Sequence, residues 1–252
     1  MKLVKSLVAC FSTYSRIPMP VVDLDSDDMK YALVFLPVIG AVIGIIEYCI
    51  YIVAGLFVLP KMFRVLIMAV IPLIITGGIH IDGYMDTVDA FSSYSDREKK
   101  LAIMKDPHTG AFAVIYFAIY GLIFLAFSYL INDRSILSFC YSFVVARALS
   151  GIAAVTIKSA KSSGMLHDVK KNTSKNIVII SLFVILLVVF LTVLYSNVYV
   201  VILWLVSSVI IYFWYKRKMM RELDGITGDT SGYFMCIMEL VLIVISSVGG
   251  LL

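Results

Sequence analysis

The chain has 252 residues, of which 61% are hydrophobic and only 15% are charged, and its formal net charge is +4. A soluble domain averages roughly 45–50% apolar and about 25% charged residues, so a soluble fold of this length could not bury so much apolar surface. No run of Lys and Arg is interleaved with aromatic residues, which argues against nucleic acid as a partner. The sequence therefore predicts a single integral membrane domain, residues 1–252, in contact with a lipid bilayer.

The first residues carry a helical pattern. Apolar residues from Val4 to Phe11 recur at i, i+3, i+4 and i+7, with Lys2 and Lys5 off that face. This spacing is typical of an amphipathic helix that lies in the membrane interface, and a packed N-terminal helix fits it equally well.

Seven apolar stretches follow, and a helix needs about 20 mostly apolar residues to cross a bilayer. They run from Leu33 to Val58, Met62 to Gly78, Ala111 to Ile131, Ile136 to Ile157, Ile177 to Tyr195, Val198 to Tyr215 and Tyr233 to Leu252. The second is short if it ends at Gly77-Gly78, and it could continue as a helix beyond the membrane. We expect an all-α polytopic transmembrane bundle of about seven spans, with short cytoplasmic helices in its loops.

Positive charge alternates between the connections. Of the 21 Lys and Arg residues, 17 fall in the N-terminal segment or in 79–110, 158–176 and 216–232. Cytoplasmic loops of membrane proteins carry an excess of Lys and Arg. The pattern therefore predicts that these segments and the N-terminus face the cytoplasm, in a multi-pass protein of the cell (inner) membrane whose C-terminus lies outside.

Three charged residues lie well within the predicted spans: Glu47, Arg147 and Glu239. Charges at this depth are costly and usually face the interior of the bundle. We expect Glu47, Glu239 or both to hold Arg147, and a role facing a substrate is the alternative.

Segment 77–89, GGIHIDGYMDTVD, spaces Asp82, Asp86 and Asp89 at i, i+4 and i+7. This spacing puts three carboxylates on one face of a helix, where like charges repel each other. A bound cation is the simplest compensation, and oxygen ligands favour Mg²⁺ or Mn²⁺. The alternative is a solvated acidic face on a cytoplasmic helix.

Two further polar loops contain candidate ligands. Lys105 and His108, in KDPHTG, could meet phosphate oxygens, although a turn followed by a helix cap explains the same residues. Asp229 lies in the Gly-containing loop DGITGDT before the last span and could complete a metal site from the same membrane face. A loop that only caps the last helix through Asp229 or Thr230 is the alternative.

The run GGIHIDGYMDTVDAFSS, followed by REKKLAIMKDPHTGAFAV, resembles the signature of the cobalamin synthase family, the adenosylcobinamide-GDP ribazoletransferases. FSTYSRIPMP near the N-terminus and GDTSG near the C-terminus resemble two other elements of this family, in the family's order. The resemblance implies a Mg²⁺-dependent membrane transferase that acts in the last steps of cobalamin biosynthesis. It joins adenosylcobinamide-GDP to α-ribazole or α-ribazole 5′-phosphate and releases GMP.

The resemblance and the residues together assign candidate roles. In such a transfer a ribose hydroxyl attacks the corrinoid-side phosphorus of a pyrophosphate, and cations neutralise the developing charge. We expect Asp82, Asp86 and Asp229 to bind the metal, Asp89 and Lys105 to be catalytic, and His80, Lys105, Asp106 and His108 to bind substrate. Asp89 is the candidate base.

Two other classes of protein share some of these features. A CDP-alcohol phosphotransferase also carries spaced aspartates beside an Asp-Gly step, but its Ala-Arg after that step and its later Gly-x-x-x-Asp are absent. A cation transporter should carry acids near the bilayer midplane on broken helices, whereas most acids here lie in loops. The sequence leaves both a monomer and a homo-oligomer open.

Overall fold

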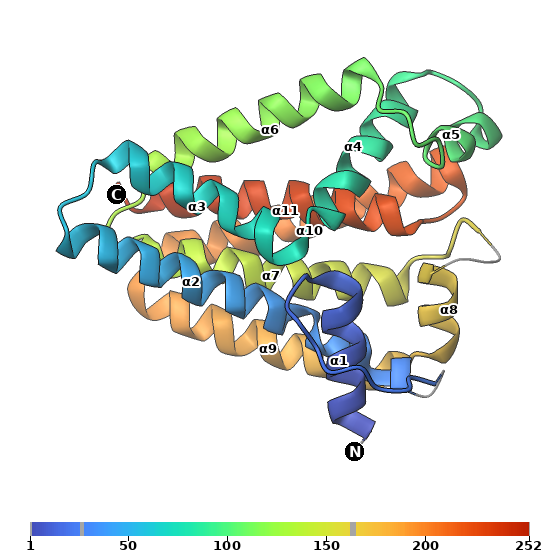
Figure 1. Cartoon of the computed structure of the whole chain (residues 1–252), viewed down its shortest axis with the longest axis horizontal. Helices are drawn as coiled ribbons and strands as arrows, with labels where there is room; N and C mark the ends of the chain where they lie inside the picture. The colour runs from blue at the N-terminus through green and yellow to red at the C-terminus, as the bar shows by residue number, and fades with distance from the viewer. Residues whose placement is uncertain (1, 26–27, 162–164, 252) are drawn as a thin grey trace.

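The computed structural model describes residues 2–25, 28–161 and 165–251, and regular secondary structure within these ranges is helical. In chain order the helices are α1 (Lys2–Tyr14), the 3-10 helix η1 (Asp28–Phe35), α2 (Leu36–Leu56), α3 (Lys61–Thr76), α4 (Ile79–Ser92), α5 (Arg97–Ile103), α6 (Ala111–Tyr129), α7 (Ile136–Thr156), α8 (Met165–Asn172), α9 (Lys175–Ser196), α10 (Val198–Leu223) and α11 (Gly228–Gly249). The predicted all-α fold is confirmed (Figure 1).

Six helices of the described chain are long and apolar enough to cross a membrane, namely η1 with α2, then α6, α7, α9, α10 and α11. Helix α3 meets the same test only together with α4, and the two are bent by 91°. The bend lies at Gly77 and Gly78, whose φ angles of +63° and +78° are left-handed values that glycine adopts at low cost. Six or seven spans agree with the expected number. The helix does resume after the second stretch, but in a new direction.

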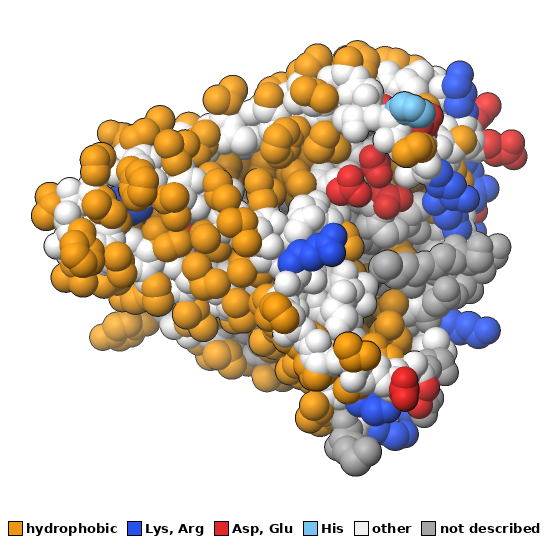
Figure 2. Space-filling model, viewed as in Figure 1, with side chains coloured by type: hydrophobic (Ala, Val, Ile, Leu, Met, Phe, Trp, Pro, Cys, Tyr) orange, Lys and Arg blue, Asp and Glu red, His pale blue; other side chains and the backbone are white. Residues whose placement is uncertain are grey.

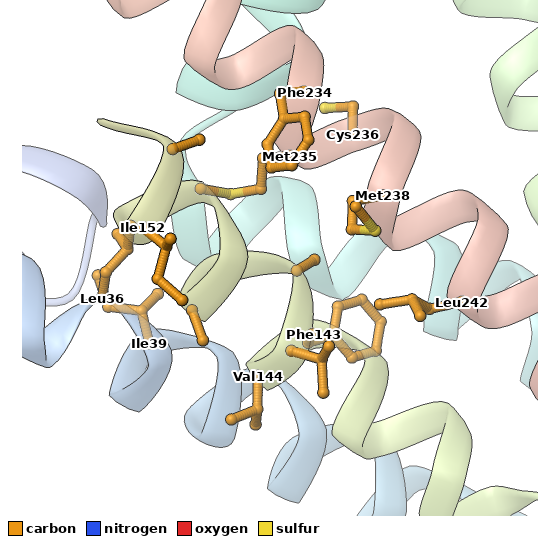
Figure 3. Close-up of a cluster of buried hydrophobic side chains, with 14 of the residues drawn as sticks. Leu36, Ile39, Phe143, Val144, Ile152, Phe234, Met235, Cys236, Met238 and Leu242 are labelled. Carbon is orange, nitrogen blue, oxygen red and sulfur yellow. The ribbon is translucent and has the colours of Figure 1, made fainter. Parts of the chain in front are cut away.

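Helix α7 forms the centre of the bundle. Its apolar window is 83% buried, and its side chains pack against α2 and α11 (Figure 3). Gly44 allows the close contact with α2, because a Cβ there would lie 2.7 Å from the carbonyl oxygen of Cys140. In contrast, only 17% of the corresponding window of α6 and 28% of those of α9 and α10 are buried. Their apolar side chains are the surface that the composition requires to face lipid.

Within the bundle, the Nη1 atom of Arg147 donates to Oε2 of Glu239 over 2.9 Å and to the carbonyl oxygen of Phe143 over 3.1 Å. Both carboxylate oxygens of Glu47 are buried without a hydrogen-bond partner in the described chain. The expected pairing of Arg147 is therefore confirmed for Glu239, while Glu47 makes no such bond.

The polar segments gather at one end of the bundle. Figure 1 shows α1, α4, α5 and α8 at this end and the C-terminus at the other. On the face seen in Figure 2 most charged side chains lie at the same end, and the rest of that face is mainly hydrophobic. Helix α1 is packed in its second half, where Val8 and Phe11 are buried, while Val4 is 66% exposed. The segments that the Lys and Arg pattern grouped together thus lie at the same end of the bundle.

Candidate active site

The acidic helix α4 lies directly against the start of α11. A Cβ atom on Gly83 would lie 2.7 Å from the carbonyl oxygen of Asp229, and one on Gly232 would lie 2.8 Å from that of His80. These two glycines therefore let the two backbones touch. The contact brings together two acidic motifs that are far apart in the sequence.

A cavity of about 290 Å³ lies beside this contact. Its walls come from η1 and from helices α1, α2, α4, α7, α8 and α11, together with the segment that follows α7. Among the residues with polar side chains it is lined by Tyr14, His80, Asp82, Ser150, Ser159, Lys161, Thr227, Asp229 and Ser231. Three residues expected from the sequence, His80, Asp82 and Asp229, thus share one cavity.

The carboxylates of the acidic face affect one another. Asp82 is exposed and Asp86 is half-buried. Partial burial, followed by the negative charges of Asp82, Asp229 and Asp89, raises the pKa of Asp86 to about 6. A cation among these groups would relieve that repulsion.

The oxygen donors at this cavity suit only a metal ion that takes few ligands from the protein. Among the described residues, no three His, Cys, Asp or Glu side chains converge closely enough to form a protein-only metal site. Mg²⁺ differs from structural metals in that it usually binds through one or two carboxylates, with water and substrate phosphates as its other ligands. Asp82 and Asp229 on one cavity, with Asp86 alongside, fit such a substrate-completed site.

Asp229 owes its position to the cap of α11. The Thr227 side chain accepts from Thr230 N over 3.2 Å, and Thr230 Oγ1 accepts from Thr227 N over 2.8 Å. In this capping box the N-cap residue is Thr227 and Thr230 completes the box from the first turn, so the alternative of a cap through Thr230 is confirmed in part, whereas Asp229 is not the cap residue. Asp229 lies instead in the first turn, where the helix dipole favours a negative charge.

The other candidate residues lie outside the cavity. The Asp89 carboxylate is packed against Gly110, which precedes α6. Lys105, Asp106 and His108 are exposed in the loop before it, and Asp106 Oδ1 lies 2.7 Å from His108 Nδ1 and accepts from His108 N over 2.9 Å. The turn expected as the alternative for this loop is therefore present, and it engages the side chains of Asp106 and His108.

Lys161 is the cavity residue that the sequence did not single out. It was one of five lysines in segment 158–176, and no spacing distinguishes it. Backbone hydrogen bonds hold the segment before Lys161 beside Ile226, because Ile226 N donates to Lys158 O and Ala160 N donates to Ile226 O, each over 2.8 Å. Partial burial lowers its pKa, and the nearby Asp229 carboxylate opposes this effect. Lys161 thus supplies a cation to the cavity from a loop remote in sequence.

The comparisons with known proteins agree on one family. The family described as cobalamin-5-phosphate synthase matches residues 6–247. The adenosylcobinamide-GDP ribazoletransferase of Lachnoclostridium phytofermentans is 36% identical, over 96% of this chain and 92% of the relative. Proteins of the same name from Clostridium perfringens and Clostridioides difficile are each 30% identical, over 93% and 95% of this chain and 94% and 96% of the relatives. No solved structure matches the chain.

The family match covers nearly the whole chain, including both acidic motifs and the N-terminal segment that helps to line the cavity. The chain therefore belongs to the cobalamin-5-phosphate synthase family.

Proposed function

We propose that this chain is an adenosylcobinamide-GDP ribazoletransferase that works with Mg²⁺ or Mn²⁺. It joins adenosylcobinamide-GDP to α-ribazole or its 5′-phosphate, and GMP is released. The observation that carries the proposal is the meeting of Asp82 and Asp229, from two separate family motifs, on one cavity with Lys161. The names of the relatives support the same activity.

The reaction forms one phosphorus–oxygen bond and breaks another. The ribose hydroxyl of the acceptor attacks the corrinoid-side phosphorus, and the bond from this phosphorus to the oxygen of GMP breaks. Asp82, Asp86 and Asp229 would hold the metal ion, which supplies positive charge to the pyrophosphate oxygens when bound. Lys161 neutralises a further phosphate oxygen as a point charge.

The hydroxyl proton passes to a carboxylate that is not bound to the ion. Asp89 is the candidate from the sequence, and it would have to turn from Gly110 toward the cavity to reach the hydroxyl. The donor is much larger than a cavity of about 290 Å³, so parts of it must extend outside. Lys105, Asp106 and His108 are proposed to contact these outer parts, because they are exposed at the same end of the bundle.

The test is an assay of the purified protein in detergent with adenosylcobinamide-GDP, α-ribazole and Mg²⁺, in which cobalamin and GMP are both measured. We expect equal amounts of the two products, no turnover with excess EDTA, and recovery with Mg²⁺ or Mn²⁺. Binding of Mn²⁺, followed by its electron paramagnetic resonance signal, should weaken in Asp82→Asn. Full turnover in excess chelator would remove the metal from the mechanism.

We also propose that the cavity faces the cytoplasm, on the strength of the 17 of 21 Lys and Arg residues in the segments at its end. Cysteines introduced at Ser93, after α4, and at Ser196, at the end of α9, test this orientation. An impermeant thiol reagent added outside intact cells should label Ser196→Cys and not Ser93→Cys. The reverse pattern would invert the proposed topology.

A further inference from the structure

A second cavity, of about 280 Å³, lies between α3, α4, α6, α7 and α11 and shares His80 and Met235 with the first. Its outer walls are apolar and include Val70 of α3 and Phe117 of α6, which are 46% and 37% exposed on helices of the membrane region. Figure 1 shows α6 lying across from α3 and α11, where this cavity is found. We name it the lateral cavity.

The inner end of the lateral cavity carries polar atoms without partners. His80 is 9% exposed and Arg147 1% exposed, and both line it. The Nε2 atom of His80 and the Nε atom of Arg147 are buried and make no hydrogen bond within the described chain. Leaving a buried polar group unpaired is unfavourable, so such groups in a cavity indicate a ligand with a complementary atom.

We propose that the lateral cavity holds the aromatic base of the acceptor nucleoside, with the ribose in the first cavity beyond His80. This inference rests on the proposed function, since it names where the benzimidazole of α-ribazole binds. The ring is flat and mainly apolar, as the walls require. Its nitrogen that is not bonded to ribose accepts a hydrogen bond, which the Nε–H of Arg147 or a ring N–H of His80 can donate.

Other occupants fit less well. A lipid acyl chain would match the walls but would leave the His80 and Arg147 atoms unpaired. The corrin ring of the donor is too large for about 280 Å³. A third cavity is lined by hydroxyl and charged side chains, including Arg16 and Asp82, alongside Ile79, Ile81 and Met85, and it suits a flat apolar ring less well than the lateral cavity does.

Gly121 of α6 provides a direct test. It lines the lateral cavity, and a Cβ added there would meet no atom within 4 Å, so Gly121→Leu would project into open space. Gly55 of α2 is equally open but does not line the cavity, which makes Gly55→Leu the matched control. We expect Gly121→Leu to raise KM for α-ribazole at least about tenfold, because the added side chain would occupy space that the base needs. KM for adenosylcobinamide-GDP should stay within about twofold of the wild-type value.

The effect should also depend on the size of the base. In Gly121→Leu, the KM for a nucleoside with benzimidazole should rise less than the KM for one with 5,6-dimethylbenzimidazole. Gly121→Ala should raise the two KM values in the same order, by smaller factors. Gly121→Ala also serves if the Leu variant does not fold. An unchanged KM for α-ribazole in folded Gly121→Leu, or a rise in KM for the donor alone, would overturn the proposal. Failure of the wild-type protein to form cobalamin would instead overturn the proposed function.

Discussion

The charged residues in the bundle interior form an ion pair, whereas the carboxylates at the polar end have no ion-pair partner within the described chain. In the bundle interior, Arg147 and Glu239 neutralise each other over 2.9 Å, and both are nearly fully buried. At the polar end, partial burial, followed by the negative charges of Asp82, Asp229 and Asp89, raises the pKa of Asp86 to about 6. None of these four carboxylates forms an ion pair within the described chain.

The difference separates a structural role from a chemical one. A buried charge must be paired in the folded protein, because water cannot reach it. Carboxylates at an accessible cavity can remain unpaired until a cation and a phosphorylated substrate arrive. Loss of the interior pair is therefore expected to lower stability, whereas changes at the acidic face are expected to lower turnover and leave the protein folded.

The largest effect is expected at the acidic face. The Asp82→Asn, Asp86→Asn double variant should lower turnover by about 10⁴-fold, or ~5.5 kcal/mol of transition-state stabilisation, because two ligands of the ion are lost. The protein should stay folded in detergent, since repulsion is relieved. Steady-state rates and thermal unfolding measure both quantities. Asp23→Asn, an exposed carboxylate elsewhere, is the control, and near-normal turnover in the double variant would refute the metal site.

Arg147→Met should destabilise the protein by about 3–5 kcal/mol, because it leaves Glu239 charged and buried without its partner. Adding Glu239→Gln should restore part of that loss, as a double-mutant cycle of unfolding in detergent would reveal. Strictly additive losses from the two substitutions would mean that the 2.9 Å contact contributes no coupling.

Gly83→Ala tests the contact that joins the two acidic motifs. Its Cβ would lie 2.7 Å from Asp229 O, so α4 must move away from α11. Such overpacking costs roughly 1–3 kcal/mol of stability. The displaced carboxylates should lower turnover by about 10- to 100-fold, since misplacement by about 1 Å has effects of this size. Gly55→Ala, which meets no atom within 4 Å, should change neither quantity, and equal behaviour of the two variants would contradict this packing.

The smallest effect is expected at Glu47. Its carboxylate oxygens make no hydrogen bond in the described chain, so Glu47→Gln removes no partner. The free energy of unfolding should change by less than about 1 kcal/mol, against a larger loss for Glu239→Gln. Chemical denaturation of the two variants side by side would compare them, and a larger loss at Glu47 would reverse the assignment of the pair.

Much of the fold was predictable because it depends on local properties. Apolar stretches long enough to span a bilayer marked the membrane helices, and Lys and Arg marked the end that carries the polar segments. Some boundaries were missed. Helix α10 extends to Leu223 although its apolar stretch ends at Tyr215, because charged residues continue a helix once it leaves the membrane. The capping box at Thr227 likewise starts α11 five residues before its apolar stretch.

The site was predictable in its residue types and only partly in its arrangement. The i, i+4, i+7 spacing of Asp82, Asp86 and Asp89 follows from helix geometry, and the family motifs pointed to Asp229. Asp89 carries the same spacing, yet its carboxylate lies against Gly110, because α6 begins there. Lys105 and His108 looked suited to phosphate, but both are exposed on the loop before α6, where His108 contacts Asp106 in a turn.

The sequence by itself determined the membrane class, the helical content, the acidic face and the family. Each of these follows from composition, periodicity or motif order, which are properties of neighbouring residues. Only the tertiary structure decided that α4 turns by 91° at Gly77-Gly78, that Gly83 and Gly232 let it touch α11, and that Lys161 enters the cavity. It also decided that Glu239, and not Glu47, pairs with Arg147. These outcomes depend on contacts between segments far apart in the chain, and no local pattern encodes which of several suitable side chains will meet.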